Sequence, residues 1–302
     1  MKKISFKNNL LNMAGLLFLP ADFDEKKRYP AIVCTHPGGG VKEQTSGLYA
    51  KKLSEQGFIA LAFDASHQGE SEGEPRYLED PTTRVEDIRC AVDYLTTLSY
   101  VDRDRIGAMG ICAGAGYTIA AAQTERRIKA VTAISAVDIG TVFRETWNRT
   151  STVADQIKLL EEVAAQRTAE ANGAKSKLVH YVPEANEINE HTHPDMIEAS
   201  DLYRTPRGGH PNSVNWFTFT SNDKCLAFDA FAQVSQYLTQ PILLIAGERA
   251  GSLHHSERVY KLAPGEKEYF IIDGASHIDL YDRPVYVDQA AAKMVSFFKK
   301  YL

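Results

Sequence analysis

Hydrophobic positions along the chain fall into short continuous runs separated by stretches with helical spacing. The run Ala31–Thr35 is rich in β-branched residues and uninterrupted, which is typical of a strand buried on both faces of a sheet. Residues 45–56 carry apolar side chains at helical spacing and stop at Gly57, so they predict a helix. The alternation continues with predicted strands at 58–64, 105–111 and 128–137 and predicted helices at 82–98 and 113–123. This order predicts a doubly wound, mostly parallel sheet with helices on both faces.

The alternation stops between residues 139 and 240. This stretch holds a long helical pattern at 153–171, an irregular part with several histidines, and a second helical pattern at 224–238. Alternation resumes after Pro241, with strands predicted at 242–247 and 268–272 and helices at 257–262 and 285–301. We therefore expect a core domain formed by residues 1–138 and 241–302, and a cap formed by residues 139–240 over the strand ends.

Composition narrows the class of protein. The chain has 302 residues, 44% hydrophobic and 24% charged, which is ordinary for a soluble enzyme. A net charge of -5 argues against a nucleic acid or an anionic membrane as partner. The four cysteines are widely separated, which favours free thiols in a reducing cytoplasm.

The N-terminus is interpreted as a two-stranded ribbon, Lys3–Lys7 and Leu11–Leu19. A secretory signal would start its apolar run sooner and end at a small-x-small cleavage site. No apolar run reaches the roughly 20 residues that span a bilayer. We therefore expect a cytoplasmic protein without a membrane partner; the sequence leaves a homodimer open.

The candidate chemistry centres on Cys112. It stands at the junction of a predicted strand and a predicted helix, with Gly110 two residues before it and Gly114 two residues after it. This is the pattern of a nucleophile elbow, whose tight turn admits only small flanking side chains. The start of a helix also favours a thiolate through the helix dipole and free N–H groups. The alternative is a small buried cysteine in a glycine-rich turn.

Two further elements fit a nucleophile at Cys112. His277 follows the last predicted strand, where an α/β-hydrolase carries its general base, and an imidazole there could form an ion pair with the thiolate. The backbone N–H of Ala113 is expected to form one half of an oxyanion hole. The glycine-rich loop after the strand at 31–35, with Gly38 and Gly39, is expected to supply the other half.

The third member of a catalytic triad is harder to place. An α/β-hydrolase has an aspartate a few residues beyond the 242–247 strand, near Ala250 or Gly251, and neither residue can serve. We favour Glu248 in the same loop over Asp138, which could instead cap a helix. His191 and His193 lack zinc-site spacing, so we expect no metal and no cofactor.

Several motifs together resemble the dienelactone hydrolase-like α/β-hydrolases, and most closely a bacterial and fungal branch that includes polyketide transferases. The matching segments span nearly the whole chain: 36–44 (HPGGGVKEQ), 68–71 (QGES), 110–114 (GICAG), 203–208 (YRTPRG) and 274–282 (GASHIDLYD). The resemblance implies an α/β-hydrolase fold and acyl-transfer chemistry in which Cys112 and His277 match the cysteine and histidine of a Cys–Asp–His triad.

The sequence thus predicts a hydrolase that cleaves small ester, lactone or thioester substrates through an acyl-Cys112 intermediate. Its partner would be a small-molecule acyl substrate. Three alternatives remain open at this stage. The first is acyl transfer to an alcohol or amine, and the second is a non-catalytic member that binds a ligand beneath the cap. The third is a redox-sensing thiol, which would need a nearby resolving cysteine.

Overall fold

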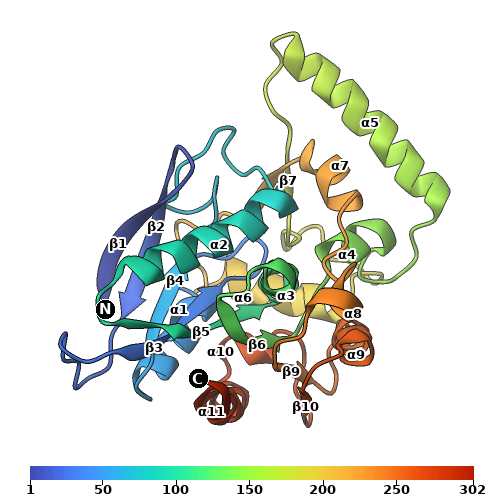
Figure 1. Ribbon diagram of the computed structural model, residues 1–302. Coiled ribbons are helices and arrows are strands. Elements are labelled where there is room, and N and C mark those ends of the chain that lie inside the picture. Colours follow the sequence, from blue (N-terminus) through green and yellow to red (C-terminus); the bar gives the residue numbers. More distant parts are fainter.

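The computed structural model describes residues 1–302 and is built on one eight-stranded sheet (Figure 1). Its strands are β1 (Lys2–Asn8), β2 (Leu11–Phe18), β3 (Tyr29–Thr35), β4 (Ile59–Phe63), β5 (Val101–Ile111), β6 (Ile128–Ile134), β9 (Ile242–Gly247) and β10 (Lys267–Ile272). They lie in the order β1-β2-β4-β3-β5-β6-β9-β10. From β4 to β10 neighbouring strands are parallel, whereas β1 and β2 form the predicted antiparallel ribbon at one edge.

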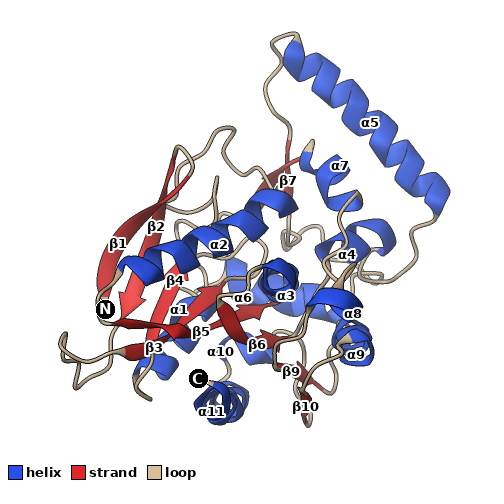
Figure 2. Ribbon diagram, in the orientation of Figure 1, coloured by secondary structure: helices blue, strands red, loops and turns tan.

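Helices cover both faces of this sheet, as Figure 2 shows, which confirms the doubly wound architecture predicted from the sequence. On one face α2, α3 and α9 share an apolar core with the sheet, and on the other α1 and α11 do so. The helices outside residues 139–240 are α1 (Thr45–Ser54), α2 (Pro81–Thr97), α3 (Ala113–Thr124), α9 (Leu253–Leu262), α10 (Asp279–Asp282) and α11 (Pro284–Tyr301). None of the helices in the structure is both long and apolar enough to cross a membrane.

Residues 139–240, which we call the insertion, connect β6 to β9. Their elements are α4 (Ile139–Glu145), α5 (Val153–Ala171), β7 (Leu178–His180), α6 (Pro194–Arg204), β8 (Trp216–Thr218), α7 (Ser221–Leu226) and α8 (Val234–Tyr237). Strands β7 and β8 pair antiparallel as a small separate sheet. Helix α5 projects from the body (Figure 1), and Val163 is its one buried residue. The last part of the insertion returns to the core, where Phe231 and Val234 pack in the same cluster as α3.

The helix predicted at 224–238 is interrupted, which corrects the sequence interpretation. Helix α7 ends at Leu226 and α8 begins at Val234. Between them, one side chain just before the insertion and one near its start bind the backbone. Asp138 accepts a hydrogen bond from the amide of Ala230, and Arg144 donates to the carbonyl of Phe228. Tertiary contacts therefore satisfy the backbone groups that a continuous helix would have paired.

Helix α6 lies in the part of the insertion that the sequence analysis left irregular. His193 is its N-cap, with the imidazole accepting a hydrogen bond from the amide of Asp195, and Pro194 occupies the first turn. Proline at the first helical position, after a residue with a side-chain acceptor, is a readable start signal. The helix matters for function because it lines the pocket described below.

Candidate active site

Cys112 sits at the junction of β5 and α3 in a backbone conformation that confirms the sharp turn expected there. Its φ of 56° and ψ of -125° lie in a region that non-glycine residues rarely adopt. A Cβ at Gly110 would overlap the carbonyl oxygen of Gly114, and one at Gly114 would overlap the carbonyl oxygen of His36. Both glycines are thus required by close backbone approach. The turn lifts the Cys112 side chain into a pocket at the carboxyl ends of the strands.

The glycine-rich loop after β3 lies against this turn. The backbone N–H groups of Ala113 and Gly38 are both directed at the Cys112 sulfur. Gly39 has a φ of 72°, a conformation that turns the chain, and its carbonyl accepts a hydrogen bond from Ser213 at 2.7 Å. His36 shapes the same loop, because its ring contacts the Pro37 carbonyl at 2.7 Å and accepts from the Ala65 amide at 3.1 Å.

His277 follows β10 and is buried, with 1% of its surface exposed. Both of its ring nitrogens have partners. Nδ1 lies 2.6 Å from the Ser252 hydroxyl, and Nε2 lies 3.0 Å from the hydroxyl of Tyr281. The Tyr281 side chain also lowers the pKa of the Cys112 thiol, and both residues line the same pocket. The structure therefore brings Cys112, Tyr281 and His277 together, with Tyr281 hydrogen-bonded to the imidazole.

The structure does not bring either predicted acid to His277. Glu248 is exposed, and its carboxylate accepts a hydrogen bond from the Gly274 amide at 2.9 Å. The chain leaves β9 with this side chain pointing to solvent, and four residues later the buried Ser252 occupies the place beside Nδ1. Asp138 caps α4 and the segment before α8, accepting from Gly140 and Ala230. A serine hydroxyl thus stands where we expected a carboxylate.

Burial keeps the cysteine and the histidine uncharged. It raises the pKa of the Cys112 thiol, although hydrogen bonds from Tyr281, Ala113 and Gly38 act in the opposite direction. Burial, together with the charge of His193, lowers the pKa of His277 from its ordinary value of 6.5 to about 3. Both shifts favour a neutral thiol and a neutral imidazole at rest over the ion pair expected from the sequence.

Asp195, in the first turn of α6, is a site residue whose role the sequence analysis missed. Its carboxylate accepts hydrogen bonds from the backbone amides of Gly251, at 2.8 Å, and of His277. It therefore holds together the loops after β9 and β10, which carry Ser252 and His277. Burial raises the pKa of this carboxyl. The sequence signal for the start of α6 could have placed Asp195 in the first turn of a helix. Its contacts could not be predicted, because Gly251 and His277 lie more than fifty positions further along the chain.

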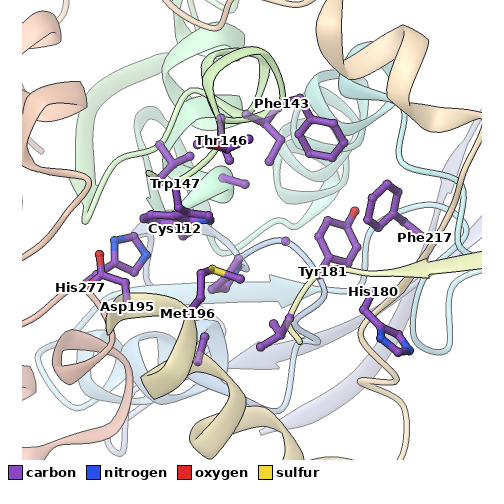
Figure 3. Close-up of a pocket in the computed structure, with 18 of the residues that line it drawn as sticks. Cys112, Phe143, Thr146, Trp147, His180, Tyr181, Asp195, Met196, Phe217 and His277 are labelled. Atoms are coloured by element: carbon purple, nitrogen blue, oxygen red, sulfur yellow. The ribbon is translucent and has the colours of Figure 1, made fainter. Parts of the chain in front are cut away.

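The pocket has a volume of about 350 Å³ and lies between the strand ends and the insertion (Figure 3). Trp147 packs edge-to-face against the His277 ring, with ring centroids 5.2 Å apart. Tyr181 and Phe217 form the opposite wall, with centroids 4.6 Å apart. Sixteen of the 23 lining residues are hydrophobic. Asp195 is the one acidic residue among them, and no lysine or arginine lines the pocket. The site thus combines a thiol at the strained turn with an apolar, nearly uncharged chamber.

The strand order, the strained turn at Cys112 and the histidine after the last strand define an α/β-hydrolase. Comparison with known proteins gives the family. The model of the dienelactone hydrolase family matches residues 13–137. The uncharacterized protein YcjY of Escherichia coli (strain K12) is 44% identical over 99% of both chains. The chain belongs to the dienelactone hydrolase family. This membership supports the conclusion that the protein is a hydrolase.

Two other comparisons extend this assignment. The crystal structure of the hypothetical protein PA2218 from Pseudomonas aeruginosa is 37% identical, with a TM-score of 0.92 over 100% of this chain and 93% of that one. The polyketide transferase claH of Penicillium crustosum is a more distant relative, 26% identical over 92% of this chain and 91% of its own length. The resemblance to a branch that includes fungal polyketide transferases is thereby confirmed.

Proposed function

We propose that the protein hydrolyses small esters, lactones or thioesters, with Cys112 as the nucleophile and an acyl-Cys112 intermediate. The Cys112 sulfur attacks the carbonyl carbon while its proton passes to the His277 side chain. Collapse of the tetrahedral adduct expels the alcohol or thiol, and His277 then activates the water that releases the acyl group. The observation that carries this proposal is the grouping of Cys112, at the strained turn, with His277 and Tyr281 in one pocket.

The amides of Ala113 and Gly38 would act as the oxyanion hole. In the resting protein they are directed at the thiol sulfur. When the sulfur bonds to carbon, the carbonyl oxygen gains negative charge close to these donors, which need no rearrangement to stabilise it. We further propose that the insertion serves as a cap, since Trp147, Tyr181 and Phe217 form walls of the same chamber.

The chamber favours neutral, apolar acyl groups. No lysine or arginine lines it, and Asp195 would repel a substrate carboxylate. We expect kcat/KM to be about 100-fold higher for p-nitrophenyl hexanoate than for the p-nitrophenyl monoester of adipate, because burial of an unpaired carboxylate costs several kcal/mol. The two substrates have equal chain length, so steady-state kinetics on both isolates the charge. Equal values would contradict this specificity, and no turnover across a panel of acyl chains would contradict the hydrolase itself.

Acyl transfer to an alcohol or amine is the second candidate. The apolar walls of the chamber favour it, since they limit the water that reaches the acyl-enzyme. Added alcohols and amines would then yield new esters and amides from p-nitrophenyl butyrate, detected by mass spectrometry. Hydrolysis alone in the presence of these acceptors would rule against it.

Substitutions of Ser252 and Glu248 give a matched test of which residue is the third member of the catalytic triad, beside Cys112 and His277. With the proton on Nδ1 of His277, the Ser252 oxygen accepts a hydrogen bond that fixes the ring with Nε2 toward Tyr281. Ser252→Ala is expected to lower kcat/KM for p-nitrophenyl butyrate five- to tenfold, since such a bond contributes about 1 kcal/mol. Glu248→Gln, in the same loop but exposed, is expected to stay within about twofold of wild type. The reverse ranking would restore Glu248 as the acid.

A further inference from the structure

We infer that the Tyr281 hydroxyl is a catalytic group that relays the proton between Cys112 and His277. The inference rests on the proposed function, because it describes how the thiol of that mechanism loses its proton. The hydroxyl lies 3.0 Å from Nε2 of His277, and Tyr281 lines the same pocket as Cys112, whose thiol pKa it lowers. The other ring nitrogen of His277 is occupied by Ser252, so Nε2 is the nitrogen that can accept a proton.

A tyrosine hydroxyl can carry out this transfer because it has one proton to donate and lone pairs that accept another. As the sulfur bonds to the carbonyl carbon, its proton moves to the Tyr281 oxygen. The original Tyr281 proton moves at the same time to Nε2, so the phenol stays neutral and the imidazole becomes imidazolium. In collapse of the adduct, the proton returns from Nε2 through the same hydroxyl to the departing alcohol or thiol.

The pKa shifts of Cys112 and His277 fit such a path. Burial disfavours both the thiolate and the imidazolium, so the proton has to move during the attack. Burial and the neighbouring Cys112 also raise the pKa of Tyr281, which keeps the phenol protonated and able to donate. The titratable groups around the hydroxyl are Cys112, His277, Asp195 and Tyr203.

The position of Tyr281 is fixed from two sides. Helix α10, which carries it, is held from the core by Tyr49, whose hydroxyl donates to the carbonyl of Leu280 at 2.9 Å. It is held from the insertion by Arg207, which binds both carboxylate oxygens of Asp282 at 2.7 and 2.8 Å. The residues on either side of Tyr281 are therefore anchored, and its own hydroxyl is left to contact the two reacting groups.

The test measures acylation of Cys112 by p-nitrophenyl butyrate in a single turnover, from pH 6 to pH 9.5. For wild type we expect a nearly flat rate from pH 6 to 8. Tyr281→Phe should acylate about 100-fold more slowly at pH 7. Its rate should rise about tenfold per pH unit, since only thiolate formed by hydroxide can then react. Tyr49→Phe is the matched control, because it removes a buried tyrosine hydroxyl that anchors the same helix without touching the sulfur; its profile should stay flat.

A flat profile for Tyr281→Phe, at the wild-type rate or below it, would overturn the relay and leave the hydroxyl with a structural role. Absence of acylation in wild type would instead overturn the proposed function. If Tyr281→Phe does not fold, the relay can still be tested on wild type by measuring the acylation rate in mixtures of H₂O and D₂O. Transfer of two protons in the same step makes a plot of the rate against the deuterium fraction curve downward. A straight line would show that one proton moves and would overturn the relay.

Discussion

Cys112→Ala is expected to abolish the acyl adduct that wild-type protein forms with p-nitrophenyl butyrate, and to lower the rate of hydrolysis by at least about 10⁴-fold. The sulfur is the one nucleophile that the amides of Ala113 and Gly38 surround. Alanine fits the turn sterically, so the fold and the pocket should persist. Intact mass spectrometry after brief exposure to the ester detects the adduct, and peptide mapping locates it.

Cys90→Ala provides the control for this experiment. Cys90 is a free cysteine on α2, and burial raises the pKa of its thiol to about 12. Its replacement should leave both the adduct and the hydrolysis rate as in wild type. An adduct that persists in Cys112→Ala, or its absence from wild type, would exclude Cys112 as the nucleophile and favour a family member that only binds its ligand.

His277→Ala is expected to lower kcat/KM by about 10²- to 10⁴-fold, the usual loss when a general base is removed.

The pH dependence of kcat/KM in wild type tests the protonation state of the same residue. The base must be unprotonated, and burial lowers the pKa of His277 to about 3, so the imidazole is ready to accept a proton throughout the range above pH 4. As the pH falls from 7 to 5, kcat/KM should therefore stay nearly constant and show no loss centred near pH 6.5.

His191→Ala is the control, since the side chain of His191 is 85% exposed and lies outside the pocket. Its kinetics and pH profile should match those of wild type. An acid limb near pH 6.5 in wild type would mean that the imidazole titrates at its ordinary pKa and that burial does not lower it.

Much of the fold could be predicted because its signals are local. The buried run at Ala31–Thr35, the glycines around Cys112 and the position of His277 after the last strand are each readable within about ten residues. Each reflects a backbone requirement: burial on two faces, close approach in a tight turn, or a loop at a strand end. The break in the helix predicted at 224–238 was not readable, because the side chains that cause it lie more than 80 residues earlier.

The sequence alone determined the doubly wound sheet, the turn that presents Cys112 and the order in which His277 follows it. Only the tertiary structure decided what these two residues contact. It set Ser252, rather than Glu248, beside the imidazole and Tyr281 between the ring and the thiol. It also set the burial that raises the pKa of Cys112 and lowers that of His277. The reason is physical: hydrogen-bond partners and desolvation depend on packing between distant segments, whereas turns and strands depend on residues close in the chain.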